Sequence, residues 1–362
     1  MIRFTLVAVF LLAVFSSSGA AARAVLDTAP LPPGGETQVW SPIFQASWDK
    51  LNSQHAGKPG KVSPPNTLIA QLNEFSWKKD AVMPKGGYGI FVGPCTPEFA
   101  ASTAAAIQKQ FGVRMAPSRL PTTPGGNALY GILLRDLKFR KSFFRARKQP
   151  LLFTETGGKS HKVAFFGSIG KHSDFYGNNV KVLDYNKHGK SFILSIATDH
   201  PDEHLIIYQP DRVLSFKTAI THVNASIKAP LAGPYGSLTD GTLHKNDTVK
   251  IPYLTLKADT DFTSQLQGER HYDGEKATYE IKMAYQITRF ALFEKGARIR
   301  VETGTGDGPF GDPDPTPKRV IYVRRNFIYE KPFFVFAWRE KSPLPYFAAW
   351  IDGKEALTPF DK

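Results

Sequence analysis

The feature that most constrains this chain is a stretch near its C-terminus that cannot pack into a protein core. Residues 302–319 have almost no apolar side chain, many glycines, and a proline at every second position near their end. Proline and glycine at this density exclude regular helix and strand and are typical of an exposed loop. We therefore expect an exposed loop over residues 303–319, preceded by a strand at 297–301.

A strongly apolar segment follows this loop. It has two runs, Pro332–Trp338 and Tyr346–Asp352, joined by a polar turn at Arg339–Pro343. Two apolar runs around a short polar turn predict a buried hairpin. The C-terminal part of the chain is thus expected to be strand, exposed loop and buried hairpin.

Helices are predicted mostly in the first third of the chain and strands mostly after it. Trp40–Leu51 is predicted to be a short buried helix capped by Ser41, and Asn66–Trp77 has helical spacing. A third helix, Pro97–Phe111, follows Thr96 as its N-cap. Strands are predicted at 88–92, 127–134, 191–197, 249–257 and 279–283. Helices early and strands late indicate an α+β fold rather than a parallel α/β sheet.

The N-terminus has the pattern of a secretory signal peptide. Arg3 precedes an apolar run at 4–15, and small residues offer cleavage after Ala22 or Ala24. We expect residues 1–24 to be the signal, 25–37 a flexible leader and 38–362 one domain, because no linker interrupts the rest. The run is too short to span a bilayer. The mature protein is therefore expected to be secreted, extracellular, free of any membrane anchor and monomeric.

The composition is basic and nearly free of cysteine. Lys and Arg total 46 against 32 Asp and Glu, so the formal net charge is +14. Such a surface favours anionic partners, and does not choose among sulfated glycans, nucleic acids and acidic proteins. Cys95 stands alone, so no internal disulfide can form. Asn224 and Asn246 begin glycosylation sequons.

Several segments, taken in order, resemble the serpin family of serine protease inhibitors. They are Tyr88–Val92 leading into Pro97-Glu98-Phe99, Asn127-Ala128-Leu129-Tyr130, Lys138–Phe143, Val163–Phe166 with Gly170-Lys171, Val180–Tyr185 with Gly189, Ile251–Leu256 and the hairpin Lys331–Asp352. Each match is short, whereas their shared order and spacing cover most of residues 88–352. The resemblance implies a serpin-like α+β fold with mixed sheets.

The departures from the family pattern indicate a divergent and shortened member. Phe139 stands where the family has tryptophan, and Ala349-Trp350 stands where it has Gly-Arg. The Pro/Gly-rich segment 116–126 leaves no room for the helix that crosses the central sheet in the family.

The resemblance implies that the exposed loop is bait for a protease. In the family, the cut loop inserts into the central sheet as a new strand and distorts the acylated protease. Gly304 and Thr305 resemble the hinge of such a loop, and Lys318-Arg319 is then the candidate scissile site for a trypsin-like protease.

The composition of the loop favours a serpin-like protein that does not trap proteases. Proline cannot pair within a central strand, and Pro309, Pro313, Pro315 and Pro317 would each disrupt one. Burying the loop's aspartates would add a further cost. The alternatives are a working inhibitor of trypsin-like proteases, cut at Lys318-Arg319, and an unrelated secreted α+β binding protein.

A dense basic run follows the Asn127 strand and has phenylalanines between its cations. The candidate polyanion-binding residues are Lys138, Arg140, Lys141, Arg145, Arg147 and Lys148. One interpretation is a site for a sulfated glycan or another polyanion. The other, which we favour, is a solvated rim whose phenylalanines face the core.

Two patterns that could indicate a cofactor or metal site lack the structural context that such a site requires. Gly306–Gly311 matches a dinucleotide pattern but leads into prolines instead of a helix, and His200 and His204 flank a proline turn. We therefore expect no catalytic residue, no metal and no cofactor.

Overall fold

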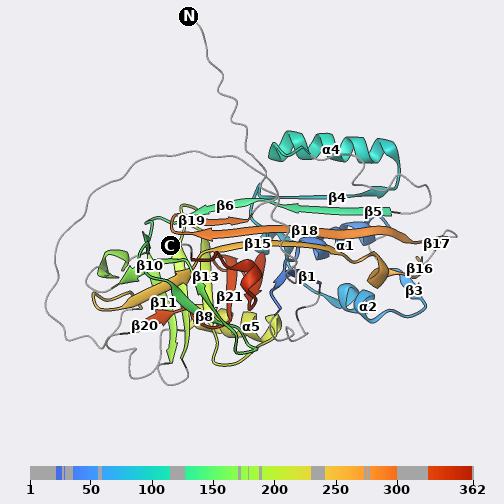
Figure 1. The fold of residues 1–362 in the computed structure, drawn as a ribbon. Coiled ribbons are helices and arrows are strands. Elements are labelled where there is room, and N and C mark those ends of the chain that lie inside the picture. Colours follow the sequence, from blue (N-terminus) through green and yellow to red (C-terminus); the bar gives the residue numbers. More distant parts are fainter. Residues whose placement is uncertain are drawn as a thin grey trace, which may run out of the picture.

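The computed structural model describes residues 22–26, 28, 36–55, 59–114, 127–169, 173–177, 179–186, 190–229, 241–272, 275, 278–299 and 325–360. The described helices are α1 (Ile43–Ser53), α2 (Thr67–Glu74), α3 (Lys79–Val82), α4 (Pro97–Phe111) and α5 (Phe216–Lys228). They accompany three larger sheets and two small ones (Figure 1).

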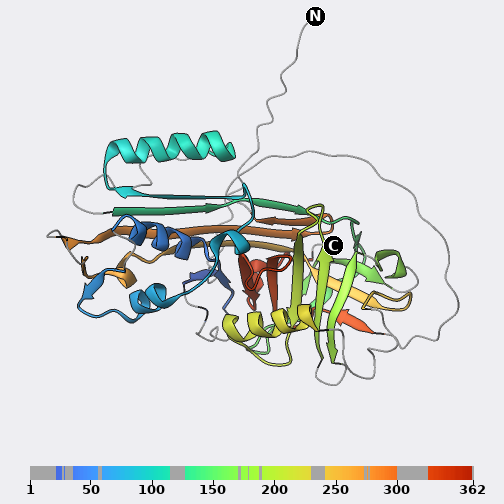
Figure 2. The ribbon, with the colours of Figure 1, turned by 180° about the vertical axis from the view of Figure 1, so that it is seen from behind.

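The central sheet has the order β4 (Tyr88–Pro94), β5 (Asn127–Leu133), β18 (Ile281–Phe293), β19 (Gly296–Ile299), β6 (Arg135–Lys138), and β15 (Leu254–Asp261) pairs with the other side of β18. Helix α4 lies on one face of this sheet, while α1 and α2 lie on the other (Figures 1 and 2). Alternation along β5 explains both contacts. Ala128, Tyr130 and Ile132 pack under α4, and Leu129 packs with α1.

The second sheet has the order β1 (Arg23–Val25), β2 (Gln38–Trp40), β22 (Phe347–Ile351), β21 (Phe333–Arg339), β13 (Glu203–Gln209), β12 (Ser191–Ala197), β11 (Val180–Asn186). The predicted C-terminal hairpin is confirmed as β21 and β22, which pair antiparallel in the middle of this sheet. Side chains of both strands are buried on both faces, between the large core and the cluster around α5.

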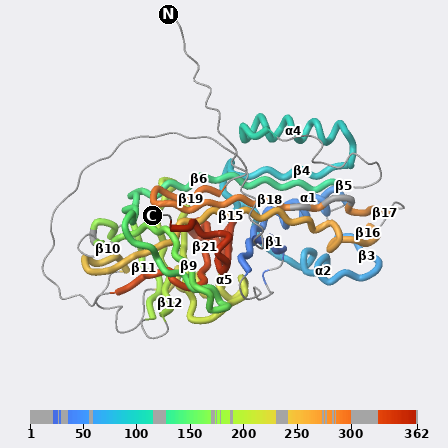
Figure 3. Tube along the Cα trace, viewed as in Figure 1, coloured from blue at the N-terminus to red at the C-terminus, as the bar shows by residue number. Residues whose placement is uncertain are grey.

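The third sheet has the order β20 (Asn326–Ile328), β14 (Thr248–Pro252), β10 (Phe165–Ile169), β7 (Phe144–Arg145). Two small sheets complete the fold: β17 (Thr278–Tyr279), β16 (Glu269–His271) and β3 (Lys61–Ser63) form one, and β8 (Leu151–Thr154) and β9 (Ser160–Val163) form the other. The β3–β16–β17 sheet lies at the end of the molecule away from the third sheet (Figure 3).

Local sequence signals explain the predicted helices that form. The Thr96 hydroxyl accepts a hydrogen bond from the Phe99 backbone N–H, and Gly112 ends α4 with a φ of 67°. Asn66 caps α2 in the same way, through the backbone N–H of Ile69. The predicted Ser41 cap is wrong, because Pro42 is the N-cap of α1. The Ser41 hydroxyl donates to the carbonyl of Tyr346 at 2.9 Å and accepts a 3.4 Å hydrogen bond from the backbone N–H of Ile43.

Three further differences separate the structure from what the sequence predicted. Helix α5 was not predicted, although Ser215 caps it and Phe216, Ala219, Ile220 and Val223 form its buried face. The single strand predicted at 249–257 is two strands, β14 and β15, which belong to different sheets. The strand β1 lies where a signal end and flexible leader were predicted, and it pairs in parallel with β2.

Candidate functional site

The strand that precedes the predicted loop is β19, and it lies inside the central sheet between β18 and β6. Strand β18 runs the length of the sheet, turns at Glu294 and Lys295, and returns as β19 between β18 and β6. Phe293 pairs with Gly296, and Phe290 pairs with Ile299. The turn requires glycine at 296, because a Cβ there would lie 2.2 Å from the Leu137 carbonyl oxygen.

Beyond the end of β19, no described strand separates β5 from β18. Strands β5 and β18 pair directly and in parallel, from Asn127 opposite Ile281 to Leu129 opposite Ala284. Within the described ranges, the pairs on this side of β18 stop there and begin again only at Phe290. The central sheet is therefore closed at one end and split by β19 at the other.

A small cavity lies between the end of β19 and the part of the sheet in which β5 and β18 pair directly. Its volume is about 20 Å³, and its lining includes Gly131 and Leu133 of β5, residues 286–289 of β18 and Ile299 at the tip of β19. The Gln286 side chain is buried here, and its Oε1 has no hydrogen-bond partner within the described residues. The packing between β5 and β18 is therefore incomplete next to Ile299, the last residue of β19.

The two faces of β19 differ in polarity. Ala297 and Ile299 are buried, whereas Arg298 is partly exposed and its Nε lies 3.8 Å from an Asp136 carboxylate oxygen. Odd-numbered positions therefore face the core and even-numbered positions face outward. The predicted strand at 297–301 is confirmed in its described part, but it belongs inside the sheet and does not lead out of it.

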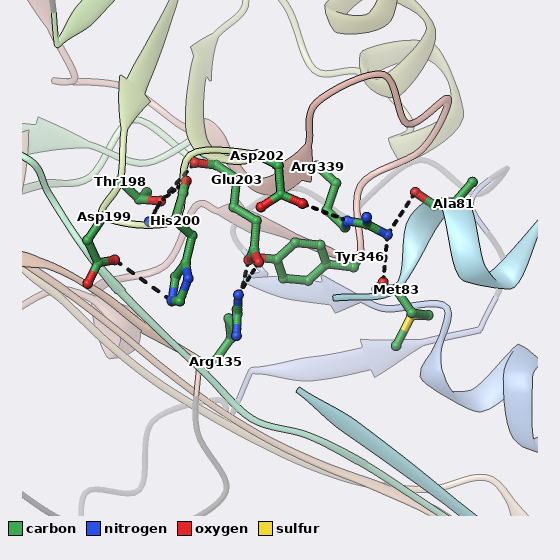
Figure 4. Close-up of polar contacts among 10 residues, drawn as sticks. All are labelled: Ala81, Met83, Arg135, Thr198, Asp199, His200, Asp202, Glu203, Arg339 and Tyr346. Atoms are coloured by element: carbon green, nitrogen blue, oxygen red, sulfur yellow. Dashed lines mark hydrogen bonds and ion pairs between the residues drawn. The ribbon is translucent and has the colours of Figure 1, made fainter. Parts of the chain in front are cut away.

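A polar network around Glu203, shown in Figure 4, includes one residue of β6 that lies next to the end of β19. Arg135 of β6 pairs in the sheet with Ile299, and its Nε donates to the Glu203 carboxylate at 2.9 Å. The Tyr346 hydroxyl donates to the same carboxylate at 2.7 Å. Burial, and then the negative charge of Glu203, raises the pKa of Tyr346 well above its usual value. This Glu203 network joins the central sheet to the second sheet beside the split.

Arg339 extends these contacts toward the N-terminal helices. Its Nη1 donates to the carbonyl of Asp80 and to those of Ala81 and Met83. Its Nε lies 3.5 Å from the Asp202 carboxylate, and Figure 4 shows the contacts with Ala81, Met83 and Asp202. The C-terminal hairpin is thereby tied to α3 as well as to β13.

The chain after the predicted loop is anchored by a buried ion pair. Arg325 and Asp247 are both almost fully buried, at 1% and 0% exposure. The guanidinium donates to the Asp247 carboxylate at 2.6 Å from Nη2 and at 3.1 Å from Nε. The Arg325 backbone N–H also donates to this carboxylate. The chain is therefore held at Arg325, directly before it enters the third sheet as β20.

The predicted loop itself lies outside the described residues. This applies to residues 303–319, to the hinge candidates Gly304 and Thr305, and to the scissile candidates Lys318 and Arg319. The structure nevertheless places the start of the preceding segment, because β19 enters the sheet at Gly296.

The basic run is only partly a solvated rim. Phe139 and Phe143 are buried in the core, as expected, but the Phe144 side chain is 57% exposed. The cations stand outward to different degrees: Lys138, Arg140, Arg145, Arg147 and Lys148 are exposed, and Lys141 is half-buried. The run therefore presents one aromatic ring together with its charges.

A second exposed ring lies near Phe144. Phe175 is 44% exposed, and Tyr176 packs edge-on against both phenylalanines. The Lys141 ammonium lies 4.1 Å from the centre of the Phe175 ring. A cavity of about 210 Å³, lined by Phe144, Arg145, Ala146, Phe165 and Gly167, opens beside this pair. We call Lys141, Phe144, Arg145 and Phe175 the aromatic–basic patch.

The remaining sequence candidates are dispersed. Asn224 is half-buried on α5, and Asn246 is exposed just before β14. Within the described ranges, no group of three or more His, Cys, Asp and Glu side chains is arranged to hold a metal ion. None of the described helices has the length and apolar character that crossing a bilayer requires.

Comparison with known proteins gives a fold but no close relative. No family model matches the chain, and no curated protein matches its sequence. Among solved structures, the chain is similar to native protease nexin-1 with heparin: 14% identity, a TM-score of 0.51, and coverage of 88% of this chain and 92% of that one.

Two further structures support the same fold. Human thyroxine-binding globulin is 9% identical, with a TM-score of 0.52 and coverage of 88% and 92% of the two chains. Serpin-12 of Manduca sexta is 14% identical, with a TM-score of 0.50 and coverage of 89% and 93%. The protein therefore has the serpin fold, as the ordered sequence segments predicted. At these identities the similarity establishes the fold alone.

The sequence reasoning missed the groups that organise this region. Glu203 and Asp247 are ordinary acidic residues at the start of apolar strands, and no local pattern distinguishes them from exposed ones. The true entry to the sheet did leave a signal: Glu294-Lys295-Gly296 is a polar turn between two apolar stretches.

Proposed function

We propose that this protein is a secreted inhibitor of serine endopeptidases whose loop enters the central sheet after cleavage. The observation that carries the proposal is the position of β19, since the first residues after β18 already lie between β18 and β6. This proposal departs from the non-inhibitory protein that the loop composition favoured.

With entry at Gly296, the register of β19 places the prolines beyond the segment that would insert between β18 and β6. If the pairing of Gly296 with Phe293 continued along β18, Gly308 would come opposite Ile281, the first residue of that strand. The first proline of the loop, Pro309, lies just beyond. The prolines would lie within the inserted strand if entry began at Gly304, but they lie beyond it if entry begins at Gly296.

The sequence after β19 continues the same alternation. Val301, Thr303 and Thr305 would follow Ile299 on the core side, while Arg300, Glu302 and Gly304 would follow Arg298 on the outer side. Small or β-branched residues inside and polar residues outside suit a new strand in a half-exposed sheet. Asp307 is the first core-side position that would be costly to bury.

The entry at Gly296 also changes the candidate scissile bond. The interval that leads from Gly304 to Lys318 leads from Gly296 to Phe310. Cleavage after Phe310 would leave a short tether beyond Gly308. Cleavage after Lys318 would leave ten residues, or about 33 Å of extended chain, which is too slack to press a protease against the protein. The proposed target is therefore a chymotrypsin-like enzyme, and Lys318-Arg319 would be cut without trapping.

The test compares two proteases on the mature protein. Near-equal amounts of chymotrypsin should give an adduct that survives a denaturing gel, and Edman sequencing should place the cut after Phe310. Trypsin should nick the loop at Lys318 or Arg319 without an adduct. A nick by chymotrypsin with neither an adduct nor a rise in Tm would make the loop a simple substrate, and would restore the non-inhibitory hypothesis.

A matched pair of variants tests insertion itself. Val301→Arg places a charge on the core side of the new strand and should convert the inhibitor into a substrate. Glu302→Arg makes the neighbouring change on the outer side and should keep the adduct. Equal behaviour of the two variants would contradict the proposed alternation.

Secretion rests on the signal-like N-terminus, and β1 chooses between its two cleavage sites. Ala24 is fully buried in β1, and its backbone N–H donates to the Thr260 hydroxyl at 2.8 Å. Cleavage after Ala22 would keep Arg23–Val25, whereas cleavage after Ala24 would remove most of that strand. Sequencing of the exported protein should find Arg23 first; an intracellular, unprocessed chain would contradict secretion.

A second candidate function is binding of a sulfated glycan at the aromatic–basic patch. Its support is that Phe144 and Phe175 are exposed beside Lys141 and Arg145, because rings stack on sugar faces while cations meet sulfates. Retention on a heparin column should weaken more in Phe144→Ala than in Leu152→Ala, which removes an equally exposed apolar side chain elsewhere. Equal retention would exclude the patch.

A further inference from the structure

An arginine whose guanidinium makes no hydrogen bond to the described residues lies in the small sheet at the far end of the molecule. Arg270 is the middle residue of β16 and pairs with Val62 of β3 and Tyr279 of β17. Figure 3 shows these three strands at one end of the molecule. Its strand neighbours Glu269 and His271 are exposed, whereas Arg270 is 1% exposed. Across the described residues, none of its three guanidinium nitrogens has a hydrogen-bond partner.

The Arg270 guanidinium lies near aromatic side chains, whose polar atoms bond to amide groups. Its guanidinium carbon lies 5.5 Å from the centre of the Trp48 ring, which projects from α1. The Trp48 indole N–H donates to Asn73 Oδ1 at 2.8 Å. The Tyr272 hydroxyl donates to Asn52 Oδ1 at 3.4 Å. Burial lowers the pKa of Arg270, and only the phenol of Tyr272 opposes this effect.

The second buried arginine shows what is missing. Arg325 is equally buried but meets the Asp247 carboxylate with several hydrogen bonds. A guanidinium stays protonated at any ordinary pH, so burial cannot neutralise Arg270. A buried charge without a partner costs several kcal/mol in real proteins. An anion bound to the Arg270 guanidinium would therefore stabilise the fold around it.

We propose that Arg270 is the anchor of a buried binding site for a small carboxylate. The planar fork of the guanidinium matches two carboxylate oxygens, and the Trp48 ring supports it from α1. Trp48 belongs to an apolar cluster with Leu51, Ile69 and Leu266, which suits a ligand with a short alkyl group. The site is independent of the loop and of the central sheet's split.

Access to this site would pass His55. Its ring stacks on Tyr272, with the ring centres 3.9 Å apart, and its Nδ1 lies 3.0 Å from the Glu275 carboxylate. Both side chains lie nearer the surface than Arg270. Movement of His55 would expose Tyr272 without unfolding β16.

The test measures Tm in sodium acetate and in sodium chloride at equal ionic strength. Wild-type Tm should rise with acetate concentration and saturate, because a ligand that binds only the folded state stabilises it by mass action. Arg270→Met nearly fills the same volume without charge, so it should lose the acetate-specific rise and should be at least as stable as the wild type in chloride. The same acetate response in both proteins would overturn the proposal.

Two further variants keep the test decisive. Arg270→Lys retains the charge without the fork and should weaken acetate binding at least tenfold, which isothermal titration calorimetry can measure even if Arg270→Met fails to fold. Asp273→Asn removes the first acidic residue that follows Arg270 in the sequence, and Asp273 lies outside the described residues. It should bind acetate like the wild type. Acetate binding that appears only in Asp273→Asn would overturn the proposal, since Asp273 would then be the internal partner.

Discussion

At the residue scale, the ion pair of Asp247 and Arg325 controls how the chain leaves the loop region. Asp247 accepts from the Arg325 side chain and backbone and from the backbone N–H of His244, all in the buried interior. Asp247→Asn would leave the guanidinium buried without its counter-charge. We expect a loss of about 3–5 kcal/mol in the free energy of unfolding, measured by urea denaturation. Asn246→Asp, at the exposed neighbouring position, should change stability little, and a similar loss in both variants would contradict this role.

At the element scale, strand β4 lies at the edge of the central sheet and its backbone is covered by side chains. Within the described residues, no strand pairs with its outer side. Its outward carbonyls instead accept hydrogen bonds from Gln110, Lys50 and Gln54, at Tyr88, Ile90 and Val92 respectively. Such caps prevent an edge from pairing with another chain.

Removal of these three caps should expose the β4 edge. The triple variant Lys50→Ala, Gln54→Ala, Gln110→Ala should form dimers or larger species in a concentration-dependent way, which size-exclusion chromatography with light scattering can detect. A triple alanine change at Lys217, Lys228 and Lys257, exposed lysines away from β4, controls for lost polar surface. A monomeric cap variant would show that the edge is protected by other means.

At the scale of the whole molecule, buried tyrosines set the alkaline limit of stability. Burial raises the pKa of both Tyr176 and Tyr208 to about 12, from an ordinary value of 10.0. Because the folded-state pKa is raised, the folded protein holds these protons more tightly than the unfolded chain. The stabilisation is complete below pH 10 and is lost as the pH rises through the folded values near 12.

The free energy of unfolding should therefore fall between about pH 10 and pH 12. Denaturant titrations across this range can measure it, with tyrosinate absorbance followed in parallel. Tyr176→Phe and Tyr208→Phe together should flatten the slope, whereas an unchanged slope would assign the alkaline loss to other groups. Both variants remove one hydroxyl and keep the buried ring.

Much of this fold could be predicted from the sequence. The elements predicted correctly are those whose ends and buried faces are defined by residues within the same segment. The Thr96 cap and the Gly112 stop delimit α4, and the apolar runs of the C-terminal hairpin bury themselves on both faces. The ordered serpin-like segments likewise predicted the α+β fold. Helix α5 was missed although its cap and apolar face were present, because strands dominate the sequence on both sides of it.

What only the tertiary structure decided is where distant segments meet. The sequence shows that residues 297–301 favour a strand, but whether that strand ends the sheet or splits it depends on β6 and β18 lying on either side. The sequence likewise lists Glu203, Asp247 and Arg270 as ordinary charges. Their burial, and the presence or absence of a partner, arises from packing between elements far apart in the chain. Charge burial is a property of the assembled core, so no local pattern encodes it.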